Sequence, residues 1–312
     1  MEAAPLQISR MEGQSSGSVE EKTPKGIPGP GDSESMPASK KAKTGMEAGT
    51  NSNLAAGSAD ATNCRKRTIW NPKVVEHLRV CQGVSLLRCE EGGLCTRNMI
   101  PGKATYNGYI TYVQDEDGTV VEYRPWNTFR SPLAAAIARA PEDIFVAPGF
   151  RVLYLGDGEG AIATVSHISD IIGTRGVVYE VESCLQNAAK LVNMAARRAN
   201  VTPILEDARH PENYQAAILR KVDVVYCDMS YISEDEQVAI LSKNVSLYLK
   251  DGGFFLLTYE AGDRNSSLYE RRKRLHTALE AEKLFVIKDI CLEPLILNAG
   301  LLFGVYRNAS LI

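Results

Sequence analysis

From residue 151 onward, short apolar runs alternate with longer segments whose apolar residues recur every three or four positions. The short runs predict buried strands, and the longer segments predict amphipathic helices. The strands are expected at 151–155, 177–181, 201–205, 222–227, 253–259, 284–290 and 301–306. The helices are expected at 161–172, 183–198, 211–219, 234–247 and 265–282. This alternation predicts a mostly parallel sheet with helices on both faces.

The part of the chain before residue 150 has a different pattern. Strands are expected at 84–89 and 104–114, and residues 115–118 supply a turn that returns the chain as a hairpin through 119–124. A helix is expected from Pro132 to Ala140, because proline fits the first helical turn. We therefore predict a small β-rich domain at 67–126 and a Rossmann-like domain at 127–312.

Residues 1–66 are predicted to be a disordered tail. Ser, Gly, Ala, Pro, Glu and Lys dominate the segment, and no aromatic residue occurs before Trp70. Such a composition buries too little apolar surface to offset the entropy lost on ordering. Basic clusters at 40–43 and 65–67 have the composition of nuclear-import signals, although clusters this short are also common by chance.

Composition excludes several classes of protein. No apolar run approaches the roughly 18 residues that span a bilayer, and the N-terminus has no signal-peptide core, so we expect no membrane partner. The seven cysteines are scattered without a CxxC pair, which indicates neither a metal site nor a disulfide framework. A formal net charge of −3 means that any RNA binding must come from a local basic face or from a partner.

Candidate chemistry gathers at the predicted carboxyl ends of the strands. Gly156, Gly158 and Gly160 follow the first strand of the large domain, where a close approach to a ligand excludes a Cβ atom. Glu182 follows the next strand, at about the spacing of a ribose-binding acid. Because Asp207 and Asp228 also follow strands, a cofactor site is favoured over a simple tight turn. Seven strands ending in an antiparallel pair are typical of class I S-adenosylmethionine-dependent methyltransferases rather than of nicotinamide dehydrogenases.

Several longer phrases then resemble one family. They are EYRPWNTFRS (122–131), LAAAI (133–137), VLYLG (152–156), TVSHISDIIG (164–173), EDARHP (206–211), VDV (222–224), LEP (292–294) and GVYR (304–307). Together they closely resemble fibrillarin, over roughly residues 75–307 and in the same order. The resemblance implies RNA-guided 2′-O-methylation of ribosomal RNA by a subunit of a box C/D small nucleolar ribonucleoprotein, in the nucleolus of the nucleus.

The resemblance also implies partners and binding residues. Guide RNA and a coiled-coil scaffold protein would supply the targeting, and S-adenosylmethionine would be the cofactor. Glu182 and Asp207 would hold its ribose and adenine, since carboxylates accept hydrogen bonds from hydroxyl and amine donors. Read without the family, each of these acids is simply a residue at the start of a helix.

The departures from the family concern the reacting site. The family places Lys, Asp, Lys and His around the ribose hydroxyl, which needs a base and positive charge to react. Here the aspartate is retained as Asp228, whereas the other three positions hold Pro132, Glu260 and Ala299. The glycine loop is about two residues longer and gains Asp157 and Glu159, and Tyr231 replaces a cofactor-proximal Gln.

Three functions therefore remain open. The first is a weak or inactive fibrillarin-like subunit of an rRNA-processing particle, which the lost cations favour. The second is an active guide-dependent 2′-O-methyltransferase with a rebuilt site, with Tyr259 or His210 as replacement base. The third is a methyltransferase retargeted to a protein side chain. The basic run 271–274 is either an RNA-phosphate contact or a solvated helix face.

Overall fold

The computed structural model describes residues 66–69, 75–78, 83–87, 93–103, 110–114, 117–141, 146–156, 158–261 and 267–307. Residues 1–65 lie outside the described residues, so the predicted disordered tail and the import cluster at 40–43 stay predictions. The described residues all belong to one compact unit that covers 59–312. The predicted boundary between a small and a large domain near residue 126 stays a proposal.

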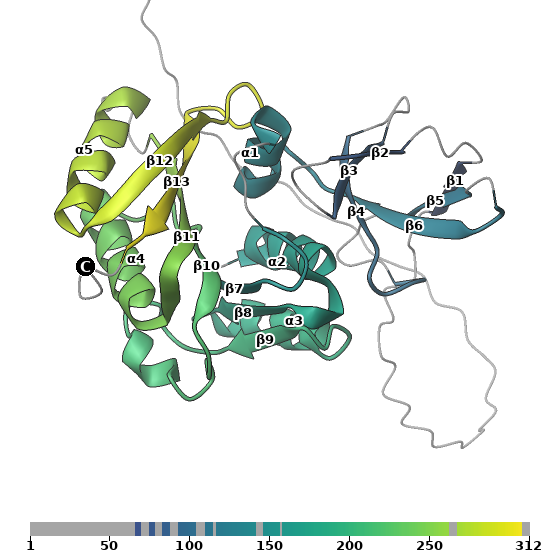
Figure 1. The fold of residues 1–312 in the computed structure, drawn as a ribbon, viewed down its shortest axis with the longest axis horizontal. Coiled ribbons are helices and arrows are strands. Elements are labelled where there is room, and N and C mark those ends of the chain that lie inside the picture. Colours follow the sequence, from purple (N-terminus) through teal and green to yellow (C-terminus); the bar gives the residue numbers. More distant parts are fainter. Residues whose placement is uncertain are drawn as a thin grey trace, which may run out of the picture. The chain divides into compact units, whose positions relative to one another are not determined.

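A six-stranded sheet forms the N-terminal part of the described chain (Figure 1). Its strands are β1 (Lys66–Ile69), β2 (Val75–His77), β3 (Val84–Leu87), β4 (Leu94–Arg97), β5 (Ile110–Gln114) and β6 (Val120–Pro125). The order across the sheet is β1-β5-β6-β4-β3-β2. The predicted hairpin is confirmed, because β5 and β6 pair antiparallel from Thr111–Tyr123 to Gln114–Val120.

The second sheet has seven strands in the order β12-β13-β11-β10-β7-β8-β9. They are β7 (Arg151–Leu155), β8 (Val177–Val181), β9 (Val201–Ile204), β10 (Val222–Cys227), β11 (Leu249–Glu260), β12 (Leu284–Cys291) and β13 (Ala299–Tyr306). β7 to β11 pair in parallel, and β13 pairs antiparallel with both β11 and β12. The predicted class I methyltransferase-type sheet with its antiparallel ending is therefore confirmed.

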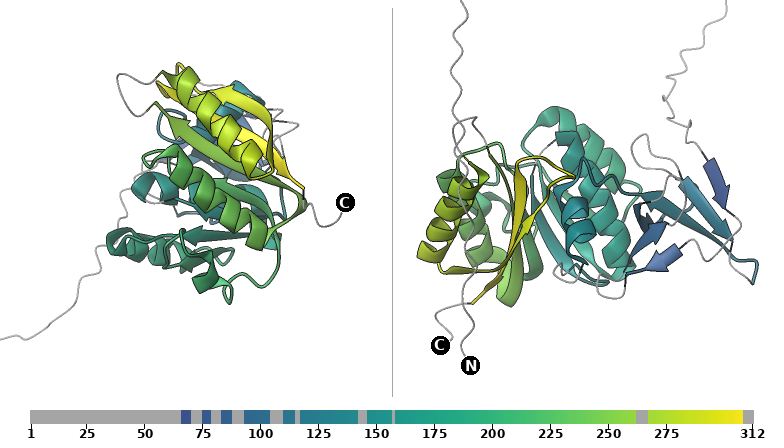
Figure 2. Two further views of the ribbon diagram at one scale, coloured as in Figure 1. Left: turned by 90° about the vertical axis from the view of Figure 1, so that its left-hand side faces the viewer. Right: turned by 90° about the horizontal axis from the view of Figure 1, so that it is seen from above.

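Helices cover both faces of this sheet (Figures 1 and 2). On one face lie α1 (Pro132–Arg139), α2 (Gly158–Ile172) and α3 (Leu185–Ala195), which pack with the inward side chains Val152 and Tyr154. On the other face lie α4 (Glu234–Tyr248) and α5 (Leu268–Ala281), which pack with Leu153 and Leu155. Adjacent residues of β7 thus feed two separate cores, as the two-residue period of a strand requires. No helix among the described residues is long and apolar enough to cross a membrane.

Three expectations about the elements were wrong. The helix predicted at 211–219 is only a short 3₁₀ turn, Pro211–Tyr214, because Tyr214 turns inward to donate to Asn244 of α4. α2 begins at Gly158 rather than 161, so two of the three glycines belong to its first turn. The short strands β1, β2 and β4 were not predicted; β4 has only four residues, of which Leu94 and Cys95 are apolar, yet its Thr96 is also fully buried, against α2.

Candidate functional site

The candidate site lies where the chain changes direction across the seven-stranded sheet. After β7 the chain moves to β8 and β9 on one side, and it returns to β10 on the other side of β7. The crevice beyond the carboxyl ends of β7 and β10 is therefore the switch point, where open α/β sheets bind ligands. The two strand ends are joined there, because the backbone N–H of Asp228 donates to the carbonyl of Leu155 at 2.8 Å.

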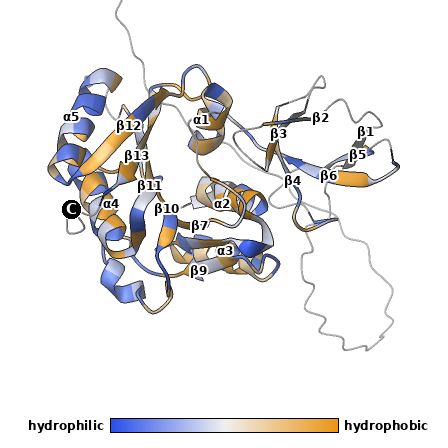
Figure 3. Ribbon diagram, in the orientation of Figure 1, coloured by the Kyte–Doolittle hydropathy of each residue, from blue (hydrophilic) through white to orange (hydrophobic). Residues whose placement is uncertain are grey.

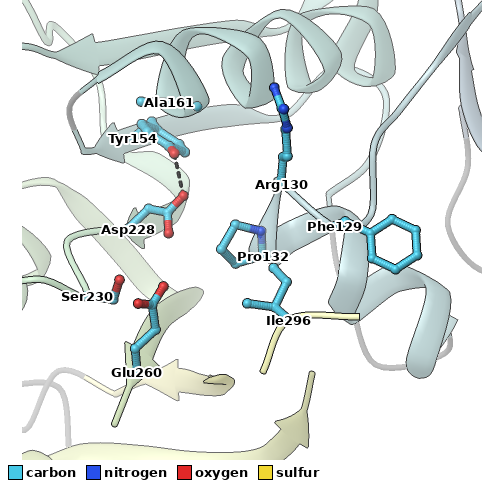
Figure 4. Close-up of a pocket in the computed structure, with 10 residues that line it drawn as sticks. Phe129, Arg130, Pro132, Tyr154, Ala161, Asp228, Ser230, Glu260 and Ile296 are labelled. Atoms are coloured by element: carbon cyan, nitrogen blue, oxygen red, sulfur yellow. Dashed lines mark hydrogen bonds between the residues drawn. The ribbon is translucent and has the colours of Figure 1, made fainter. Parts of the chain in front are cut away.

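A pocket of about 230 Å³ opens at this crevice. Six separate stretches of the chain contribute to its lining, which comprises Phe129, Arg130, Pro132, Tyr154, Gly160, Ala161, Asp228, Ser230, Glu260 and Ile296. Figure 4 shows Asp228, Ser230 and Glu260 on one side of the pocket, with Pro132 and Ile296 facing them. The pocket thus has one oxygen-rich wall and one apolar wall.

Asp228 is held in place by a phenol. The Tyr154 hydroxyl donates to Oδ2 of Asp228 at 2.5 Å, and the pocket wall includes both residues. Burial raises the pKa of Asp228, and the negative charge of Glu260 acts in the same direction, whereas the hydrogen bond from Tyr154 opposes them. Burial and the neighbouring Asp228 also raise the pKa of Tyr154, so its phenol keeps its proton and serves as a donor.

The structure brings two of the three substituted positions into this pocket. Glu260 ends β11, and Pro132 opens α1 after Ser131, whose side chain caps the helix by accepting from Ala134. A hydrogen bond of 3.0 Å between Ser131 and Thr164 of α2 fixes the start of α1. The third position, Ala299, pairs with Glu260 across β11 and β13 but is fully buried and does not line the pocket.

The glycine loop meets two different steric requirements. A Cβ on Gly156 would lie 2.7 Å from the Tyr154 ring, so only glycine lets that ring reach Asp228. Gly158 has a φ of +92°, a conformation that side chains with a Cβ rarely adopt. At Gly160, in contrast, a Cβ would make only an ordinary contact of 3.9 Å with the carbonyl oxygen of Arg130, and the residue lines the pocket. Asp157 and the side chain of Glu159 lie outside the described residues.

Glu182 contacts this glycine loop through its carboxylate. Its carboxylate accepts the backbone N–H of Gly158 at 3.2 Å and that of Cys184 at 2.7 Å. Two donors leave acceptor capacity on the carboxylate, so the residue fits a ribose diol while it also anchors the first turn of α2. Asp207, beyond the next strand, is half-exposed and accepts from the backbone and side chain of Arg209. These two carboxylates therefore fit a donor-rich ligand such as a nucleoside.

A second acid lies behind Glu182, and sequence reasoning missed it. Glu180 is fully buried opposite Tyr154 on the neighbouring strand, and neither carboxyl oxygen has a hydrogen-bond partner among the described residues. Burial raises the pKa of Glu180 well above its ordinary value, and the charge of Glu182 acts in the same direction. Both effects favour the protonated, neutral form of this side chain in the core.

Glu180→Met should stabilise the protein, because it removes an unpaired polar group from the core. We expect a gain of about 1–3 kcal/mol in the free energy of unfolding at neutral pH. The pKa is raised in the folded state, so that state binds more protons than the unfolded chain above the ordinary value of 4.5, and stability falls as pH rises. Denaturant titrations from about pH 5 to pH 8 should show this fall in the unaltered protein and a flatter profile in Glu180→Met. Glu180→Gln, as control, should flatten the profile with a smaller gain; no change in either variant would contradict the assignment.

The basic run on α5 is mostly engaged with the protein itself. Arg271 is buried, and it donates to the carbonyls of Ser230 and Ile232, so it holds the loop after Asp228. Arg272 pairs with Asp289, and Arg274 pairs with Glu234. Figure 3 shows α5 as largely hydrophilic. Of the two interpretations of this run, an RNA-phosphate contact or a solvated helix face, neither fits Arg271, whose side chain is buried and turned inward.

Neither residue that we named as a replacement base reaches the pocket. Tyr259 is buried in the core on the face of the sheet that α4 and α5 cover, and its hydroxyl donates to Asp289 at 2.8 Å. His210 is more than half exposed and lies 3.3 Å from Glu212. The pocket residues that sequence reasoning missed are Phe129, Arg130, Tyr154, Ala161, Ser230 and Ile296. For Tyr154 and Ser230, their places beside the glycine loop and Asp228 were the available signals.

Comparisons with known proteins agree with this fold. The family model described as fibrillarin matches residues 74–308. The rRNA 2′-O-methyltransferase fibrillarin 1 of Arabidopsis thaliana is 41% identical over 227 residues, which is 72% of each chain.

Two solved structures share the architecture. The fibrillarin of Aeropyrum pernix, in complex with natively bound S-adenosyl-L-methionine, is 33% identical with a TM-score of 0.64, covering 74% of this chain and 97% of that one. A fibrillarin/Nop5p complex gives 30% identity and a TM-score of 0.58, over 75% of this chain and all of the other. On the match of most of its length to the family model and to these relatives, the chain belongs to the fibrillarin family.

Proposed function

We propose that this chain is a fibrillarin-type subunit of a box C/D-type ribonucleoprotein that binds S-adenosylmethionine but methylates RNA ribose weakly or not at all. The observation that carries the proposal is the 230 Å³ pocket at the switch point, called the acceptor pocket below because an RNA acceptor would enter it. Its oxygen-rich wall holds two carboxyls, Asp228 and Glu260, and Arg130 is the one cationic side chain among its lining residues. Phosphates of an RNA acceptor would meet negative charge where a methyltransferase for RNA needs cations.

The cofactor half of the cleft supports the binding part of the proposal. Glu182 and Asp207 lie at the ends of adjacent strands, and the glycine loop leaves its backbone open to close approach. S-adenosylmethionine would supply an electrophilic methyl group there. This chain's residues would orient it, with Glu182 on the ribose and Asp207 toward the adenine.

Calorimetric titration with S-adenosylmethionine tests the cofactor site directly. We expect saturable binding by the unaltered protein, and Asp207→Asn should weaken it about tenfold, the value of one hydrogen bond to a charged group. Glu212→Gln, at an exposed residue on the following turn, is the matched control and should bind as the unaltered protein does. An absence of measurable binding would overturn the cofactor part of the proposal.

The scaffold part of the proposal has a separate test. A tagged full-length chain should recover box C/D-type scaffold and ribosome-assembly proteins from a nucleolar extract, and the tagged chain should itself locate to the nucleolus. Recovery of none of these proteins would count against the particle assignment, whatever the cofactor titration shows. Two alternatives differ from this proposal in what they require of the acceptor pocket. An active guide-dependent RNA methyltransferase would methylate a ribose there, and a retargeted enzyme would methylate a protein side chain there.

A further inference from the structure

The acceptor pocket has a chemistry that suits a cation. Asp228, Ser230 and Glu260 place their oxygen atoms on one side of it, as Figure 4 shows. The two carboxyls belong to the ends of neighbouring parallel strands, so the fold keeps them together. Ser230 adds a neutral acceptor between them in the lining. A ligand with a compact positive charge and several N–H donors would satisfy all three groups.

The opposite wall suits an aliphatic stem. Pro132 and Ile296 face the oxygen-rich side across the pocket, and Phe129 stands at the lining with 67% of its surface exposed. A long alkyl chain packs on such apolar surface while its charged end reaches the acceptors.

One cationic side chain could oppose such a ligand. Arg130 belongs to the lining, but in Figure 4 its guanidinium extends away from Asp228 and Glu260. Its carbonyl lies 3.9 Å from the Cβ position of Gly160, which places the residue beside the start of α2. Among the described residues, no salt bridge within the pocket therefore neutralises Asp228 or Glu260.

We infer that this pocket binds the side chain of a lysine on a protein or peptide, with the ammonium group on Asp228 and Glu260 and the methylene stem along Pro132 and Ile296. The ammonium group brings three donors to the three acceptors of the wall. A ribose-phosphate acceptor, in contrast, would bring negative charge toward two carboxyls. The inference deepens the proposed function, because it names what the acceptor half of the same cleft takes in place of RNA.

The test uses the full-length chain and three small probes. Nα-acetyl-lysine methylamide, its Nε-acetylated form and the norleucine equivalent are titrated separately, with binding followed by NMR and calorimetry. We expect only the lysine compound to bind, and we expect its affinity to fall with added salt. Equal binding of the Nε-acetylated compound, or displacement of the lysine compound by a short single-stranded RNA, would overturn the inference.

Variants separate this pocket from general surface charge. Glu260→Gln keeps the shape of the wall and removes one charge, so it should weaken lysine binding about tenfold to a hundredfold. Glu280→Gln removes the same charge from an exposed position on α5 and should leave binding unchanged. Equal effects of the two variants would also overturn the inference. A titration with S-adenosylmethionine on the same samples keeps the outcomes distinct, since failure of lysine binding alone leaves the cofactor proposal standing.

Discussion

The unaltered chain should methylate a guide-matched ribose barely detectably, even in an assembled particle, and lysines placed at 132 and 260 should raise that rate. A ribose hydroxyl reacts only when its proton is removed and the nearby charge is balanced, and Pro132 and Glu260 do neither. A positioned acid or base contributes about 10²–10⁴ in rate, so Pro132→Lys with Glu260→Lys should recover at least part of that range. Contributions within one site do not add simply, so the gain of the pair is not a product of single gains.

The structure changes how the third position should be restored. Ala299 is fully buried beside α1, so the histidine side chain would have to displace core atoms at a cost of about 1–3 kcal/mol in stability. The double variant is therefore measured first, and Ala299→His is added with a thermal unfolding check. Glu280→Lys on the exposed face of α5 controls for the change in net charge.

Methylation is measured by transfer of a labelled methyl group to a guide-matched RNA in the reconstituted particle. A rate for the unaltered chain comparable to that of an intact family member would refute the proposed weakness. The structure leaves Asp228, which accepts from Tyr154, as the group to test as a base in that case, because Tyr259 and His210 lie outside the pocket.

The central sheet was predictable because its strands are buried on both faces. The run 152–155 within β7 is apolar at successive positions, and such continuity is typical of a strand buried on both faces of a parallel sheet. The four-residue strand β4 has no such continuous apolar run, because polar Thr96 and Arg97 follow Leu94 and Cys95, and the burial of Thr96 depends on side chains that are distant in sequence. The hydroxyl of Thr96 is buried in hydrogen bonds with His167 and Asp170, which lie some seventy positions later in the sequence.

The site was predictable only where a residue ends a strand. That rule located Asp228 and Glu182, and the structure places both at the crevice. It could not locate Tyr154, whose ring reaches Asp228 only because Gly156 lacks a Cβ. Nor could it show that Ala299 does not line the pocket. Ala299 pairs with Glu260 across the two strands, but strand pairing does not reveal which side chains a helix covers.

The phrases that identified the family turn out to hold a buried ionic network. Arg124 comes from EYRPWN, and His167 and Asp170 come from TVSHISDIIG. Trp126 stacks on His167 with ring centroids 4.8 Å apart. Burial lowers the pKa of His167 well below its ordinary value, and the charge of Arg124 adds to that effect. These parts of the two phrases therefore reflect how β6 is held against α2.

Asp170→Asn should be the most destabilising single substitution that we propose. The carboxylate is fully buried, and it pairs with Arg124 at 2.5 Å through Oδ2 and with Arg198 at 2.6 Å through Oδ1. It also accepts from Thr96 and from the backbone N–H of Met99. Desolvation lowers the pKa of Arg124 to about 10, and Asp170 is the counter-charge that opposes this loss.

With asparagine at 170, two guanidinium groups stay buried without a counter-charge. Breaking a buried pair in this way costs about 3–5 kcal/mol, because the remaining charge is left uncompensated. Urea unfolding of the full chain should show that loss, whereas Lys250→Met, at the partly exposed pair with Asp223, should change stability by about 1 kcal/mol or less. A loss below about 1 kcal/mol for Asp170→Asn would mean that water or a shifted side chain neutralises the arginines, and that the small sheet is not held to α2 by this network.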